Sequence, residues 1–217
     1  MDWRQMERNF SSARIERYRV ARAGDRVSAA ADYALNLRLA ESMMPMLNVL
    51  EIGLRNAVHA RLTQLYREED WWRFLIGRPE FVRLLGSVNE AKSNLMVRRE
   101  RVSPDKVVAE LTFGFWCNLF NASYQEELWK HLRLAFRSCP RDQRRRKAIS
   151  GALNQVRALR NRVFHHEPLL WLTPDLDEQH RRGRKIIQWI DPDLAAWLAR
   201  HDRFSELWST KDGVSGT

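Results

Sequence analysis

The chain has 217 residues, an ordinary apolar fraction of 44% and nine tryptophans, which favours a folded domain with a real core over a disordered chain. Its formal charge of +10 is carried mainly by arginine, which binds phosphate bidentately, so the composition favours a polyanionic partner over a merely solvated basic surface. Cys117 and Cys139 lack the spacing of a zinc site or a disulfide framework. The charged N-terminus lacks a signal core, and no apolar run approaches the ~20 residues that cross a bilayer. We therefore expect a cytoplasmic protein with no membrane partner.

Hydrophobic spacing predicts helices throughout, and no segment alternates with period two. In chain order we expect a short basic helix at 11–23 and then a long helix from Ser28 to Tyr66, with a kink or break at Pro45. Ser103 and Pro104 form a start signal for a later helix. The further helices are expected at 79–101, 107–120, 123–136, 141–166, 175–188 and 192–208. Together they predict one all-α helical-bundle domain of about seven or eight helices spanning residues 1–217. Residues 1–10 and 209–217 are expected to be frayed ends.

The helix predicted at 141–166 carries the most informative pattern. On a helical wheel its apolar residues form one stripe that should face the core: Ile149, Ala152, Leu153, Val156, Leu159 and Val163. Arg160 falls within that stripe, where a guanidinium needs an acidic partner or a cleft. Glu51 on the long helix is a plausible partner, although it could equally pair with Arg55 four residues on.

Asn161 and His165 lie on a second, small and polar face of the same helix, one turn apart. The amide could orient the imidazole, and the helix C-terminus favours a protonated histidine. Arg160 and His165 are ~140° apart on an ideal helix, so a two-fold dimer would bring such groups together better than one chain. Because an Arg-x4-His pair is expected by chance in so arginine-rich a chain, its weight comes from Asn161, the HHEP continuation and the position at a helix end.

Other polar groups are weaker candidates. Arg55, Asn56 and His59 resemble the same cluster with a spacing one residue short, and we favour a supporting or core-polar role for them. His166 and Glu167 could form a second acid–base pair, although a histidine at a helix C-terminus can also simply interact with the dipole. A metal site at 165–167 is disfavoured because neighbouring side chains rarely face one ion, so we expect no metal and no other cofactor.

A basic run opens the 141–166 helix, at the end where the macrodipole disfavours cations. A bound phosphate backbone would offset that cost, so the run favours RNA contact. The candidate RNA-binding residues of this helix are Arg141, Arg144, Arg145, Arg146, Arg157 and Arg162. The tryptophans, spaced singly on apolar faces, are expected to be mostly core.

The stretch LRNRVFHHEP at 159–168 resembles the HEPN superfamily, specifically its Abi-like (abortive infection) bacterial branch. Further blocks resemble the family in the same order: MMPMLNVLEIGLRNAVHARL, the pair Trp71–Trp72, AELTFGFWCNLF, the segment from Tyr124 to Trp129, and IIQWIDPDLAAWL. The resemblance covers most of the chain, and the ordered series is more specific than the Arg-x4-His pattern alone.

The resemblance implies an all-α domain, with the motif helix in its core, that dimerises and cleaves RNA without a metal. Arg160 and His165 would be the catalytic pair, with Asn161 beside the arginine and a site completed across the dimer. It further implies a toxin or anti-phage effector in the bacterial cytoplasm, with an antitoxin or defence complex as a candidate partner. A catalytically inactive module that binds RNA or a protein is the alternative, and a plain helical scaffold is a third. Glu167 stands where some relatives carry a modifiable tyrosine, so their regulation is a poor guide here.

Overall fold

The computed structural model describes residues 1–210, and every regular element in that range is helical, as predicted. The eleven α-helices of this range are α1 (Trp3–Phe10), α2 (Ser12–Ala21), α3 (Arg26–Tyr66), α4 (Val82–Val97), α5 (Pro104–Glu110), α6 (Phe113–Asn118), α7 (Lys130–Leu132), α8 (Arg146–Phe164), α9 (Leu176–Ile190), α10 (Pro192–Ala199) and α11 (Phe204–Ser209). Short 3-10 turns fill several connectors, including Trp71–Leu75 with the tryptophan pair.

Helix α3 is the axis of the molecule. Asp25 caps its first turn by accepting from the Val27 amide at 2.9 Å, and the helix then runs 41 residues without interruption. Pro45 lies inside it, so the expected break is absent. One face is buried along most of its length, through Leu39, Met43, Met46, Leu50, Leu54, Val58 and Leu62. This periodic stripe made the long helix predictable from sequence.

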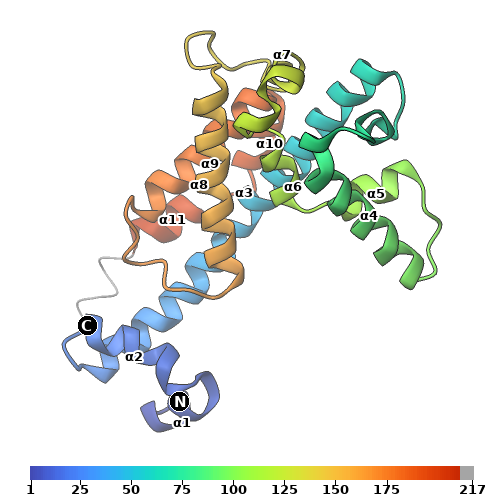
Figure 1. Cartoon of the computed structure of the whole chain (residues 1–217). Helices are drawn as coiled ribbons and strands as arrows, with labels where there is room; N and C mark the ends of the chain where they lie inside the picture. The colour runs from blue at the N-terminus through green and yellow to red at the C-terminus, as the bar shows by residue number, and fades with distance from the viewer. Residues whose placement is uncertain (211–217) are drawn as a thin grey trace.

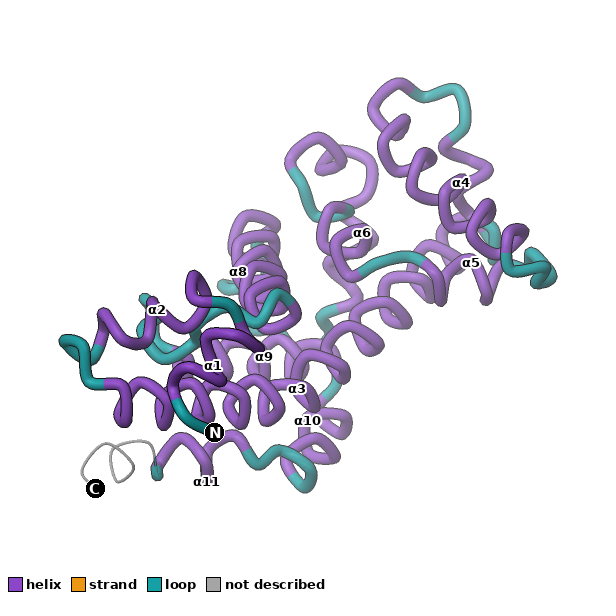
Figure 2. Tube along the Cα trace, turned by 90° about the horizontal axis from the view of Figure 1, so that it is seen from below, coloured by secondary structure: helices purple, strands orange, loops and turns teal. Residues whose placement is uncertain are grey.

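Eight of the other helices form two groups along α3 (Figures 1 and 2). Helices α1, α2, α8, α9 and α11 gather around its N-terminal part, whereas α4, α5 and α6 lie toward its C-terminal end. Gly183 of α9 meets Met46 of α3 so closely that a Cβ on Gly183 would overlap the Met46 side chain. Glycine at this crossing therefore lets α9 approach the axis.

Several predicted helices are divided, which raises the number above the expected seven or eight. Thr112 caps α6 by accepting from the Phe115 amide at 3.3 Å, so the apolar stretch 107–120 becomes α5 and α6 rather than one helix. The stretch 123–136 consists of short 3-10, π and α segments. The 141–166 helix begins only at Arg146, because residues 140–145 form turns. These divisions come from local caps and turns within correctly predicted helical regions.

The prediction that residues 1–10 are frayed is wrong. A capping box opens α1, with Asp2 and Gln5 each bonding the other's backbone amide at 2.8 Å. Trp3 and Met6 are buried in a second, smaller core with residues of α2 and α3 that include Tyr18. Burial of this apolar face holds the N-terminal helices in place. Of the other predicted frayed end, Ser209 still belongs to α11, and positions 211–217 lie outside the described residues.

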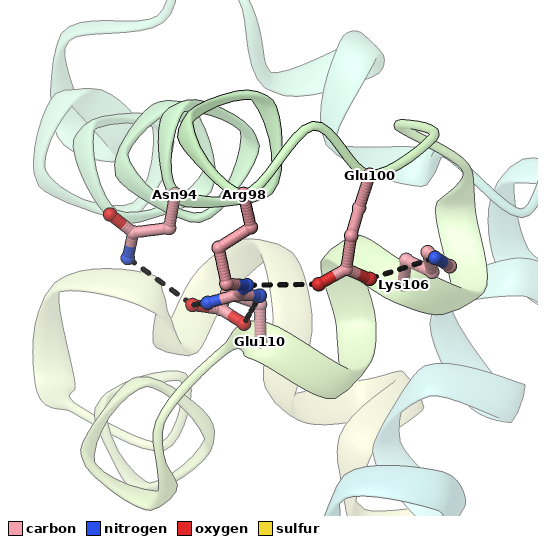
Figure 3. A network of polar contacts seen from close by, with 5 residues as sticks. All are labelled: Asn94, Arg98, Glu100, Lys106 and Glu110. Carbon is pink, nitrogen blue, oxygen red and sulfur yellow. Dashed lines mark hydrogen bonds and ion pairs between the residues drawn. The ribbon is translucent and has the colours of Figure 1, made fainter.

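A polar network joins the end of α4 to α5 (Figure 3). Arg98 contacts Glu100 at 2.9 Å and Glu110 at 2.6 Å, and Lys106 contacts Glu100 at 2.7 Å. Asn94 adds a hydrogen bond to Glu110 at 3.2 Å. Arg98 and Glu100 at the end of α4 are therefore paired with each other and with Lys106 and Glu110 of α5.

Candidate active site at the end of α8

Helix α8 presents the predicted motif, and its apolar stripe is buried as expected except at Ala152, which is half-buried. Ile149, Leu153, Val156, Leu159 and Val163 are each at most 5% exposed. The helix ends at Phe164 in a Schellman turn, in which the amides of positions 166 and 167 donate to the carbonyls of positions 163 and 162 at 3.1 and 2.9 Å. His166 occupies the left-handed position of that turn at φ 56°, where glycine is the usual residue. The HHEP sequence is thus a structured helix terminator.

The backbone after the helix is held by two distant residues. Asn36 of α3, which is 3% exposed, accepts from the Leu169 amide at 2.7 Å and donates to the Glu167 carbonyl at 3.3 Å. Arg14 of α2 donates from Nη1 to the His166 carbonyl at 2.8 Å. Both contacts use the main chain of the turn, so they leave its side chains available.

A cleft of about 420 Å³ opens at this turn, between α2 and the end of α8. It is lined by Ser11, Ala13, Arg14, Arg17, His165, His166, Glu167 and Pro168. Both histidines are exposed, and among the described residues their imidazoles make no hydrogen bond or ion pair. A larger cavity of about 600 Å³ lies between α3 and α11, but its lining mixes arginines with Glu41 and Glu206 and includes none of the motif residues. The cleft at the turn is therefore the candidate site.

Arg160 has the acidic partner that its position on the wheel requires. Its Nε lies 3.2 Å from an oxygen of Glu51, and its guanidinium lies 4.5 Å from the centre of the Phe164 ring. Arg55, the other candidate partner of Glu51, donates instead to Asn56 at 3.4 Å. Of the two pairings that the sequence left open for Glu51, the structure has the one with Arg160, across α3 and α8.

The structure separates the members of the proposed catalytic set within one chain. His165 lines the cleft, whereas Arg160 does not. Asn161 is exposed, and its one hydrogen bond to His165 in the described structure joins their backbones at 2.8 Å, not their side chains. Arg160 and His165 thus point to different surroundings, as their angular separation on the helix predicted. The expected hydrogen bond by which the Asn161 amide would orient the His165 imidazole is not present in the single chain.

The predicted RNA-binding arginines fall into two kinds. Arg144 donates to the carbonyls of positions 137 and 139 at 2.7–3.1 Å, and Arg146 donates to the Phe120 carbonyl at 3.1 Å and the Gln125 side chain at 2.6 Å. Arg157 donates to Asn118 at 2.8 Å, and Arg162 lies 3.3 Å from Glu167. These four have partners within the chain, whereas the exposed side chains of Arg141 and Arg145 make no hydrogen bond or ion pair among the described residues.

The second Arg-Asn-His cluster has a packing role. Trp71 donates from its indole nitrogen to Nδ1 of His59 at 3.1 Å. Burial lowers the pKa of His59, which keeps the ring neutral so that it can accept this bond. The supporting role favoured for Arg55, Asn56 and His59 is consistent with this contact.

Three residues of this site were missed from sequence: Arg14, Arg17 and Asn36. The basic character of the 11–23 helix was visible, but no local pattern links it to a turn some 150 residues later. Within residues 1–210, no three histidine, cysteine, aspartate or glutamate side chains gather in a metal-binding arrangement. No helix in that range is both long and apolar enough to cross a membrane.

Comparison of the chain with family models, with curated proteins and with solved structures finds no match. The geometry of the chain and the resemblance in its motifs are therefore the grounds for assigning a function.

Proposed function

We propose that the protein is a HEPN-type, metal-independent endoribonuclease that acts as a toxin or anti-phage abortive-infection effector. The observation that carries the proposal is the cleft at the end of α8, where His165 is exposed beside Arg14 and Arg17. A titratable imidazole next to fixed cations is the arrangement that cleavage of a phosphodiester by acid–base catalysis requires.

The proposed reaction is attack of the ribose 2′-hydroxyl on the adjacent phosphate. One imidazole takes the proton of the hydroxyl, a second protonates the departing 5′-oxygen, and a guanidinium stabilises the negative charge that develops on the phosphate oxygens. The products carry a 2′,3′-cyclic phosphate and a 5′-hydroxyl. Every proton moves between imidazole and RNA, so no metal enters the scheme.

The proposed active form is a homodimer in which two copies complete one site. In a single chain Arg160 faces Glu51 and Phe164 while His165 faces the cleft, so two copies offer a way to bring Arg160 to the phosphate near His165. Large apolar side chains are exposed near the Glu51–Arg160 pair, namely Ile52 at 39%, next to Glu51 on α3, and Phe164 at 47%, whose ring contacts Arg160. An apolar surface of this kind supports a contact between copies.

One observation favours the alternative, a catalytically inactive module that binds RNA or a partner protein. The Arg160 guanidinium is engaged by Glu51 and by the Phe164 ring, and this pairing reduces its ability to stabilise a phosphate. In the nuclease, binding of RNA or of the second copy has to release it. Retention of Arg160, Asn161 and His165 together supports the nuclease.

The test is incubation of purified protein with mixed RNA in EDTA, comparing wild type with His165→Ala and Arg160→Ala. We expect chelator-resistant cleavage with 2′,3′-cyclic phosphate ends that is lost in both variants. Cleavage that persists in both would refute the site, and RNA binding without cleavage would favour the inactive module. Growth arrest of bacteria expressing the wild type, relieved by His165→Ala, would connect the activity to toxicity. An Ile52→Glu variant that sediments as a monomer and loses cleavage would support the dimer.

A further inference from the structure

The cleft at the end of α8 holds two arginines to which the proposed reaction assigns no contact with the RNA. Arg14 and Arg17 lie three residues apart on α2, so they project from the same side of that helix. Both line the cleft opposite the histidine turn. They therefore offer a pair of guanidinium groups at the mouth of the proposed site.

These guanidinium groups have little else to bind. Arg17 is exposed and makes no ion pair or hydrogen bond among the described residues. Arg14 gives one N–H to the His166 carbonyl, and a guanidinium carries five such donors. The one acidic side chain of the cleft, Glu167, pairs with Arg162 of α8 at 3.3 Å. The cleft is thus cationic and does not supply its own anion.

The start of α2 adds to this positive field. Ser11 occupies the N-cap position, but its side chain accepts no hydrogen bond from the helix. Uncapped first-turn amides of a helix favour a nearby anion, and the partial positive charge of the dipole acts in the same direction. Ser11 and Ala13 both line the cleft, so this effect adds to that of the two arginines.

An exposed aromatic ring packs against α2, although it does not itself line the cleft. Trp171 is 45% exposed, and its ring centre lies 5.3 Å from that of Tyr18, which follows Arg14 by about one turn of α2. Trp171 is therefore an exception among tryptophans that were expected to be mostly core. A cationic groove next to an exposed aromatic ring is the combination that binds single-stranded nucleic acid, because the phosphate meets the guanidinium while a base stacks on the ring. An acidic peptide would match the charge but has no base to place on Trp171.

We propose that Arg14 and Arg17 bind a phosphodiester of single-stranded RNA, that Trp171 stacks on a neighbouring base, and that this places the adjacent ribose at His165. The binding part stands on the cleft itself, whereas the placement for cleavage rests on the proposed nuclease function. Arg14 and Arg17 are positioning residues in this scheme. Helix α2 then belongs to the substrate site, and the basic run at the other end of α8, ~27 Å away by helical rise, does not.

Binding can be tested separately from cleavage with a fluorescein-labelled 20-nucleotide single-stranded RNA in which every 2′-hydroxyl is methylated, since this strand has no attacking hydroxyl. Fluorescence anisotropy at several salt concentrations gives both affinity and the salt slope. We expect Arg17→Gln to weaken binding about fivefold to tenfold at low salt and to reduce the slope by about 0.7, the value for one lost phosphate contact on a single strand. Trp171→Ala should weaken binding about tenfold, as loss of one stacked base does.

Two matched controls are available in the chain. Arg8→Gln removes the same charge from an exposed position of α1 outside the cleft, and Trp197→Ala removes a ring of similar exposure, 46%, on α10. Arg8→Gln should not reduce RNA affinity or the salt slope as Arg17→Gln does, and Trp197→Ala should not reduce affinity as Trp171→Ala does. Thermal melts of all four variants check that each remains folded.

The outcomes separate this proposal from the proposed function. If wild type cleaves unmodified RNA but Arg17→Gln and Trp171→Ala bind the methylated strand like their controls, the nuclease stands and this inference is overturned. If binding depends on Arg17 and Trp171 while unmodified RNA is not cleaved, the site stands and the nuclease falls. Competition by poly-glutamate as effective as that by RNA of equal charge would overturn the assignment to RNA.

Discussion

Helices α4 and α8 end in the same backbone turn. Both close in a Schellman arrangement, in which the amide two residues past the cap returns to a carbonyl of the last turn: position 100 to position 95 after α4, and position 167 to position 162 after α8. Both place a residue other than glycine in the left-handed position, Arg99 at φ 58° and His166 at φ 56°. The sequences at these turns are also alike in type, RRE in one and HHE in the other.

The two turns differ in what their side chains do. After α4, Arg98 is shared between Glu100 and Glu110, so two of the three charged residues of that turn are paired (Figure 3). After α8, the backbone is held by Asn36 and Arg14, and His165 and His166 face a cleft without partners in the described structure. A turn whose main chain is held from outside can leave its polar side chains free for a ligand. This contrast supports the proposed site at the turn after α8.

The largest expected effect is on RNA cleavage, when the HHE sequence after α8 is replaced by the RRE sequence found after α4. The double variant His165→Arg with His166→Arg keeps or raises the positive charge of the cleft but removes both imidazoles. On the proposed function, cleavage of RNA falls by about 10²–10⁴-fold, the range for loss of a general acid or base, while binding of the methylated strand is retained. Gel-based cleavage rates and anisotropy measure the two quantities. Equal cleavage by the double variant and wild type would mean that the turn contributes charge only.

The next effect concerns the anchor of the second turn. Replacing buried Asn36 with leucine leaves the Leu169 amide and the Glu167 carbonyl without partners, and we expect a loss of about 2–4 kcal/mol in unfolding free energy. Urea denaturation followed by circular dichroism measures it. Asn94→Leu is the matched control at the first turn, because Asn94 is exposed and bonds a carboxylate that also has Arg98; its effect should be far smaller. Similar losses of unfolding free energy in both variants would mean that the two turns do not differ in how their backbones are held.

Glycine substitutions test whether the two turns are equally strained. His166→Gly and Arg99→Gly should each stabilise the fold by roughly 0.5–1 kcal/mol, because relief of the left-handed conformation exceeds the extra entropy of an unfolded glycine. Urea denaturation again provides the measurement. Destabilisation by both would show that the left-handed residues are not strained. If the cleft is the RNA site, binding of the methylated strand should respond to His166→Gly and not to Arg99→Gly.

The smallest expected effect is a pH dependence of stability that comes from the ion pairs at the turn after α4. Hydrogen bonding to Arg98 lowers the pKa of Glu110 below its ordinary value of 4.5. A carboxyl with a lowered folded pKa contributes stability that is present above the unfolded pKa and is lost as pH falls through the folded value. The stability difference between wild type and Glu110→Gln should therefore be constant above about pH 5.5 and shrink below pH 4.5. Thermal melts between pH 3 and 7 measure it, and a difference that grows toward low pH would contradict the assignment.

Much of the fold could be predicted from periodicity. The apolar stripe of α3 and that of α8 are long and regular, so their helices and buried faces follow from spacing alone. The same spacing placed Arg160 on the apolar stripe, whereas the choice of Glu51 between Arg160 and Arg55 is decided only in the structure. Boundaries were less predictable where a single cap decides the outcome, as Thr112 does between α5 and α6. The N-terminal helix was missed because Trp3 and Met6 bury against residues of α2 and α3 rather than against a pattern of their own.

The candidate site divides in the same way. His165 and Arg160 lie in one short sequence motif, so both could be identified as candidates from the sequence. Arg14 and Asn36 reach the turn from 152 and 131 residues away, and such contacts exist only once α2 and α3 have packed beside it. Local patterns predict helices and their faces, whereas the surroundings of a turn depend on which helices meet there.

The hydrogen bond from the Leu169 amide to buried Asn36 also makes the opening of this segment measurable by hydrogen exchange. That proton can exchange with solvent only when the segment detaches from α3, so its exchange rate in heavy water counts how often the end of α8 comes apart. If RNA fills the cleft and holds α2 against the turn, that single proton should exchange more slowly in the presence of the strand, even though no part of the RNA touches it.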